Sequence, residues 1–227
     1  MTRQPIGLTD LLAVVDDPQA IADLRSYFQP DLPEGVAPHY SGSRFEFIGG
    51  GGDRSEMANQ ITLDDLVAVT LLEVHVPGDV ALQLLEGSLG PDIARHLEQI
   101  PTDVSISDPA AVQLFDTSSH ARVAWDLLEE PYGMGWVITN KLLARKRPRL
   151  IPVYDRVVRC AYGRPAGLWN WLAGMYAEDA GVLSDRLLAV RDAAGLSPHI
   201  TPLRVLDVIV WMRHGPHHML SRCAGRL

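Results

Sequence analysis

The residues best suited to chemistry lie between positions 131 and 159. Gly133-Met134-Gly135 separates two helical segments, and a glycine turn before a helix exposes backbone amides that can bind a phosphate. Lys and Arg side chains follow on the second segment and could reach further phosphates of a nucleic acid. Asp155 comes after an extended stretch bounded by two prolines, at the start of another helix. This order of residue types indicates an anion-binding surface with a carboxylate beside it.

The basic side chains are concentrated in residues 141–164. This window holds eight Lys and Arg residues and one acid, for +7, whereas the rest of the chain holds 12 basic and 27 acidic residues, for −15. Such a separation favours a local anionic partner, DNA first, although the strip could instead pack on the protein's own acidic surface. The residues predicted to bind nucleic acid are Gly133, Gly135, Lys141, Arg145, Lys146, Arg147, Arg149, Tyr154, Arg156 and Arg159.

The stretch from Leu127 to Arg159 resembles the helix-hairpin-helix motif of the DNA-glycosylase superfamily. In that motif a Gly-hydrophobic-Gly hairpin binds a DNA phosphate, and a catalytic aspartate follows a Gly/Pro-rich loop. Gly133-Met134-Gly135 matches the hairpin, and Asp155 lies 155 − 133 = 22 positions after the first glycine, the family's usual separation. The lysine nucleophile of some members would fall at Val137, so the resemblance implies a monofunctional glycosylase-like hydrolase in which Asp155 is the catalytic residue.

Two segments, 141–155 and 204–212, also resemble an uncharacterised bacterial family of unknown function, which implies no chemistry. Three functions stay open. The first is nucleic-acid binding on a glycosylase-like helical scaffold, with or without base excision. The second is a non-catalytic module for protein interaction or self-association, and the third is an enzyme acting on a small anionic molecule. In the non-catalytic interpretations Asp155 is simply the N-cap of a helix.

The other candidate residues predict neither a metal site nor a cofactor. Gly215 and Pro216 interrupt the helix that would align the C-terminal histidines as ligands. The run Gly49 to Gly52 lacks the Lys-Ser/Thr of a nucleotide-binding loop and predicts a mobile loop. The remaining histidines are scattered along the sequence and suggest no cluster: His39, His75, His96, His120 and His199.

Helices must position the candidate residues between 131 and 159, and residue patterns typical of helices recur along the chain. We expect one mainly α-helical domain over 1–227, with the glycosylase-like region at 125–165 and a small β-hairpin near residues 40–50, where Arg44 to Ile48 alternate polar and apolar. Helices are predicted over 136–147, 182–194 and 203–213. Thr62 is predicted to cap a further helix, whose buried stripe would be Leu63, Leu66, Val67, Thr70, Leu71 and Val74.

Composition describes an ordinary globular chain. Of 227 residues, 47% are hydrophobic and 21% charged, and the formal net charge of −8 argues against a general nucleic-acid binder. There is no apolar run of the length that a membrane span needs, and the N-terminal region has no signal-peptide pattern. We therefore expect a cytoplasmic protein without a membrane partner, whose Cys160 and Cys223 are free thiols.

Overall fold

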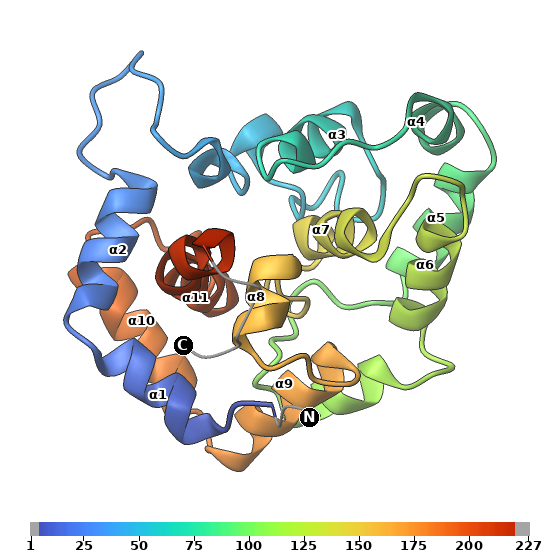
Figure 1. Ribbon diagram of the computed structural model, residues 1–227. Coiled ribbons are helices and arrows are strands. Elements are labelled where there is room, and N and C mark those ends of the chain that lie inside the picture. Colours follow the sequence, from blue (N-terminus) through green and yellow to red (C-terminus); the bar gives the residue numbers. More distant parts are fainter. Residues whose placement is uncertain (1–4, 221–227) are drawn as a thin grey trace. The chain divides into compact units, whose positions relative to one another are not determined.

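A computed structural model describes residues 5–220 and confirms the mainly α-helical prediction, with no β-strand in that range. The chain divides into two compact units (Figure 1). Unit 1 combines the N-terminal residues up to Tyr40 with the segment that begins at Val153, and unit 2 is the continuous segment Ser41–Pro152. The sequence predicts one domain over 1–227, and whether the two units form one domain stays a prediction.

Unit 1 is built around its last helix. Residues of α11 contact α8, α2 and α10 most extensively, and α1 packs on α10. The buried residues of α11 include Val205, Val208, Ile209 and Val210, which together cover more than one side of the helix, as expected of a helix enclosed by neighbours. The helices of unit 1 are α1 (Leu8–Asp16), α2 (Gln19–Phe28), α8 (Arg156–Ala161), α9 (Leu168–Glu178), α10 (Val182–Ala193) and α11 (Pro202–Leu220).

One ion pair lies inside the core of unit 1. Arg204 and Asp207, three residues apart on α11, form a buried salt bridge. Arg204 also donates a hydrogen bond of 2.8 Å to the hydroxyl of Tyr27 on α2, which ties the two helices together. Cys160 on α8 is buried and disulfide-bonded, which corrects the expectation of a free thiol there, and Cys223 lies outside the described residues.

Unit 2 contains α-helices joined by short turns and 3₁₀ segments. The pairs α5–α6, α3–α7, α4–α5 and α6–α7 make its principal contacts, and the first of these pairs is the most extensive. Buried residues such as Ile93, Leu97 and Leu128 fill the space between α5 and α6. The elements are η1 (Ser41–Arg44), η2 (Ile48–Gly50), α3 (Leu63–Thr70), α4 (Gly78–Leu85), α5 (Leu89–Leu97), η3 (Pro109–Phe115), α6 (His120–Glu129) and α7 (Trp136–Lys146).

Local sequence signals account for where several helices begin and end. Ser119 accepts a hydrogen bond of 3.2 Å from the amide of Arg122 and thereby caps α6. The backbone amide and the hydroxyl of Thr62 both donate to Asp65, at 2.9 and 3.0 Å, which closes the first turn of α3. The predicted helices over 136–147, 182–194 and 203–213 are confirmed as α7, α10 and the first part of α11.

The predicted β-hairpin near residues 40–50 is wrong, because this segment forms η1 and η2 instead. The backbone carbonyls of Phe45 and Ile48 both accept hydrogen bonds from the guanidinium of Arg145. Carbonyls three residues apart point to opposite sides of a β-strand, so a strand could not direct both at one side chain. Within residues 5–220, no helix combines the length and the apolar character needed to cross a membrane.

Candidate functional site

The structure places the centre of the basic strip inside unit 2. Lys141, Arg145, Lys146 and Arg147 are between 0 and 4% exposed, although all were predicted to contact a nucleic acid. The alternative, that the strip packs on the protein itself, describes these four residues better. Burial of charged side chains is tolerated only when their hydrogen-bond donors find partners, and those partners explain the arrangement.

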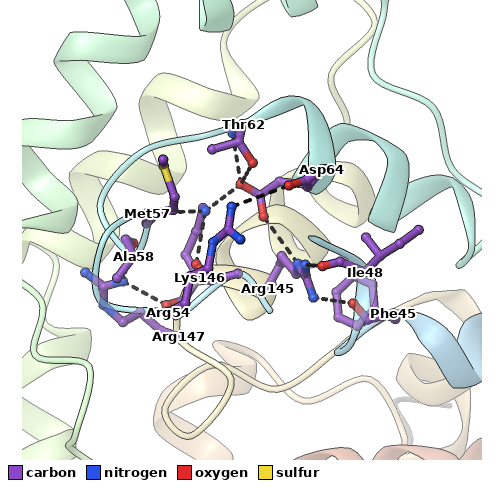
Figure 2. Close-up of polar contacts among 12 residues, drawn as sticks. Phe45, Ile48, Arg54, Met57, Ala58, Thr62, Asp64, Arg145, Lys146 and Arg147 are labelled. Atoms are coloured by element: carbon purple, nitrogen blue, oxygen red, sulfur yellow. Dashed lines mark hydrogen bonds and ion pairs between the residues drawn. The ribbon is translucent and has the colours of Figure 1, made fainter. Parts of the chain in front are cut away.

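Asp65 on α3 is the acidic partner of this cluster. Its carboxylate lies 3.2 Å from Nε of Arg145 and 2.5 Å from Nζ of Lys146, both of which are labelled in Figure 2. All three side chains are at most 1% exposed. The ammonium group of Lys146 also donates to the carbonyls of Gly52 and Met57, at 3.0 Å each, so all three of its hydrogens are used. Two buried cations thus share one carboxylate and several backbone carbonyls.

Arg147 is held without a carboxylate contact. It donates five hydrogen bonds, as many as a guanidinium has N–H groups: four to backbone carbonyls and one to the side-chain oxygen of Asn59. The carbonyls belong to Ala58, Leu97, Ile100 and Lys146. Arg147 therefore connects the loop before α3 and the end of α5 to the end of α7.

Burial dominates the electrostatics of the cluster. It lowers the pKa of Arg147 to about 10, an effect that the charge of Asp53 only partly offsets. Burial also lowers the pKa of Lys146, and the charge and hydrogen bond of Asp65 oppose that change. At neutral pH a pKa of about 10 still leaves Arg147 charged, so carbonyl dipoles stabilise a buried cation. The Asp65, Arg145, Lys146 and Arg147 side chains are called the buried charge cluster below.

Close contacts with α3 and α7 explain two of the glycines at residues 49–52. A Cβ on Gly52 would lie 2.3 Å from the carbonyl oxygen of Arg145, and a Cβ on Gly49 would lie 2.2 Å from the carboxylate of Asp64. Gly49 also has a φ of +59°, in the left-handed region that side chains disfavour. The run was predicted to be a mobile loop, whereas the structure uses its glycines for close approach to α3 and α7.

The two glycines of the predicted hairpin lie between helices of unit 2. Gly133 and Gly135 are exposed in the turn between α6 and α7, and Gly133 has a φ of +87°. Asn140 on α7 is buried and donates a hydrogen bond of 2.6 Å to the carbonyl of Pro152. Two helices joined by this turn are therefore present, and phosphate binding by the turn stays a prediction.

Asp155 caps α8 in unit 1. One of its carboxylate oxygens accepts hydrogen bonds of 2.9 Å from the amides of both Val157 and Val158, which is the geometry of an N-cap. The neighbouring Tyr154 is buried, and burial raises its pKa to about 12. The remaining arginines of the strip are exposed: Arg149, Arg156, Arg159 and Arg164.

The face of α3 that points into the core differs from the predicted one. Leu63 and Val67, predicted to be buried, are 67 and 49% exposed, whereas the helix buries Asp65, Ala68 and Val69. These three residues also have helical i, i+3, i+4 spacing, so the pattern allowed either face to point inward.

The sequence analysis also missed a pair of histidines, because their positions are 24 residues apart. His96 in the last turn of α5 and His120 at the start of α6 have their Nδ1 atoms 2.9 Å apart. The sequence suggests no cluster of histidines, but the packing of α5 on α6 brings this one pair together. The predictions for His217, His218 and Cys223 lie where the structure describes no side chains.

Comparison with known proteins identifies the chain only at the level of a family. No curated protein and no solved structure matches it. A family model described as a family of unknown function, DUF6308, matches residues 20–214. That match covers all the helices described above except α1, part of α2 and the end of α11. The chain therefore belongs to the DUF6308 family of unknown function.

Proposed function

We propose that this protein is a non-catalytic interaction module that binds a positively charged, amphipathic segment of another polypeptide through α3 and α4 of unit 2. The observation that carries the proposal is the set of large apolar side chains that these two helices expose. Leu63 and Val67 lie on one face of α3, four residues apart, and Leu82 and Leu85 on α4 are 58 and 36% exposed. Paired apolar anchors at helical spacing are typical of surfaces that receive a partner helix.

The net charge of the segment that carries these anchors supports a basic partner. Residues 62–98 contain seven acids and one arginine, for a net charge of 1 − 7 = −6. Only Asp65 among these acids is buried; Glu73, Asp79, Glu86 and Glu98 are exposed. A negatively charged surface with exposed apolar side chains attracts basic amphipathic segments. It repels nucleic-acid phosphates, because like charges repel.

Binding of a basic amphipathic peptide tests the proposal. The probe is a Leu/Lys peptide of about 18 residues with its leucines at helical spacing, and a scrambled peptide of equal composition is its control. We expect the L63S/V67S variant to bind at least about tenfold more weakly than the unmodified protein, equivalent to about 1.4 kcal/mol. Fluorescence anisotropy of the labelled peptide measures this affinity.

Two further measurements make that result specific. V182S replaces an apolar residue of similar exposure on α10 and should leave peptide affinity unchanged. The charge reversal D79K/E86K should weaken binding and flatten its salt dependence. Equal binding of the scrambled peptide, or an unaltered affinity of L63S/V67S, would overturn the proposal.

Nucleic-acid binding on a glycosylase-like scaffold is the second candidate function. Fewer basic residues support it than the sequence predicts, because four of them are buried. Arg156, Arg159 and Arg164 are exposed within nine consecutive residues of unit 1. Neutralising phosphates with such side chains makes affinity fall steeply with salt. The buried charge cluster does not supply this support, because its donors already bond to the protein.

Salt-titrated binding to two DNA duplexes, one intact and one with an abasic analogue, tests this candidate. We expect R156A/R159A to bind more weakly and with a shallower salt slope than the unmodified protein, while R95A/R122A, exposed arginines of unit 2, should match it. Base release that D155N abolishes while retaining duplex binding would support catalysis by Asp155. If the unmodified protein binds neither duplex at low salt, the candidate is rejected.

A further inference from the structure

We propose that His96 and His120 form a binding site for a divalent transition-metal ion such as Zn²⁺, held by the two Nδ1 atoms. The proposal rests on the geometry of the pair. The Nδ1 atoms face each other at 2.9 Å, the ring centroids are 5.2 Å apart, and the ring planes are inclined by 41°. Neutral imidazole nitrogens are common ligands of zinc and of other late divalent metals.

The distances fit a bridging ion after a small movement. Zinc–nitrogen bonds of about 2.0–2.1 Å in a tetrahedral arrangement place two ligand nitrogens about 3.3 Å apart. The rings would therefore separate by about 0.4 Å. His120 is exposed and His96 is half-buried, so neither ring is locked within the core. In the metal-free pair one ring carries its hydrogen on Nδ1 and donates it to the Nδ1 of the other. To bind the ion through Nδ1, that ring must shift its hydrogen to Nε2, so that both Nδ1 lone pairs face the ion.

The backbone holds the pair in place. His96 belongs to the last turn of α5 and His120 is the first residue of α6, and these two helices share the most extensive contact of unit 2. Leu97 and Ala121, the residues next to the pair in sequence, are buried. Two ligands on packed helices form a chelate with little loss of conformational freedom, in contrast to ligands on flexible loops.

The surroundings determine the expected character of the site. Within the described residues no group of three His, Cys, Asp or Glu side chains is placed to hold a metal, so water must complete the coordination. The charged groups that act on His96 are Asp92 and Arg95 of its own helix and His120 of α6. Burial, aided by the charges of His120 and Arg95, lowers the pKa of His96 and so favours the neutral ligand form at pH 7.

Zn²⁺ titration of the full, untagged chain tests the site, by calorimetry and by the NMR signals of the histidine rings. Because even loss of an outer-shell partner weakens metal affinity about 10- to 100-fold, H96A and H120A should each weaken one binding event by at least that factor. H75A, which removes another exposed histidine of unit 2, should leave this event unchanged. The C-terminal histidines are present in every variant, so their contribution is common to all titrations.

A further measurement distinguishes loss of the metal ligand from loss of folding in these variants. His120 is exposed, so H120A should retain the circular dichroism spectrum and the urea midpoint of the unmodified protein. Zn²⁺ affinity that is equal in the unmodified protein, H96A and H120A would overturn the proposal. So would ring signals of His96 and His120 that do not move when Zn²⁺ is added. Neither result bears on peptide binding by α3 and α4, which is measured without metal.

Discussion

Replacing Asp65 by asparagine is expected to lower the free energy of unfolding of unit 2 by about 3–5 kcal/mol, the usual cost of removing one partner from a buried ion pair. The side chain keeps its volume, so the change isolates the loss of charge. Arg145 and Lys146 would stay buried beside a neutral amide, each without its carboxylate. One oxygen can still accept from Thr62, so the first turn of α3 should be retained.

Urea unfolding followed by circular dichroism measures the effect of D65N. Hydrogen exchange of the amides in α3 and α7 shows whether the loss is located in unit 2. The neighbouring variant D64N is the matched control: Asp64 pairs with Arg54 at 3.5 Å near the surface, and its replacement should change stability by at most about 1 kcal/mol. A D65N protein as stable as D64N would contradict the role assigned to the buried charge cluster.

Replacing Arg147 by methionine is the second change with a large expected effect, again about 3–5 kcal/mol of unfolding free energy. Methionine fills much of the same space but donates no hydrogen bond, so four carbonyls and the Asn59 oxygen lose their donor. Each buried acceptor left without a partner costs about 1–3 kcal/mol, and local relaxation recovers part of the sum. Loss of a buried charge, whose desolvation is unfavourable, offsets another part.

Two related variants make this prediction specific. R147K keeps the charge but has only three donors for five acceptors, so its stability should fall between those of the unmodified protein and R147M. R149M changes an exposed arginine two residues away and should alter stability by at most about 0.5 kcal/mol. If R147M and R149M had equal urea midpoints, the hydrogen bonds of Arg147 would not stabilise unit 2 as described.

These stability effects change how binding experiments on the strip must be interpreted. A variant that lacks Arg145, Lys146 and Arg147 removes the donors that attach residues 45–59 and the end of α5 to α7. Loss of DNA or peptide binding by such a variant would therefore report unfolding as readily as a lost contact. Variants of the exposed Arg156 and Arg159, or of Leu63 and Val67, avoid this ambiguity.

The sequence by itself determined the helical class and much of the local structure. The caps at Thr62, Ser119 and Asp155 act within three residues, and the glycine turn before α7 depends on its own backbone. Such signals are readable because their physical cause lies within one or two turns of chain. The helices predicted over 136–147, 182–194 and 203–213 likewise agree with α7, α10 and the start of α11.

Only the tertiary structure decided which side chains face inward. On α3, Leu63 and Val67 form an apolar stripe that periodicity alone assigns to the core. Asp65 nevertheless points inward and contacts Arg145 and Lys146, which lie 80 and 81 residues away in the sequence. Long-range contacts also shaped the segment predicted to be a hairpin, and they buried four of the basic residues predicted to bind DNA: Lys141, Arg145, Lys146 and Arg147. His96 and His120 likewise met only through the packing of α5 on α6. Hydrogen-bond satisfaction of buried charges is a property of the assembled fold, so no local pattern could reveal it.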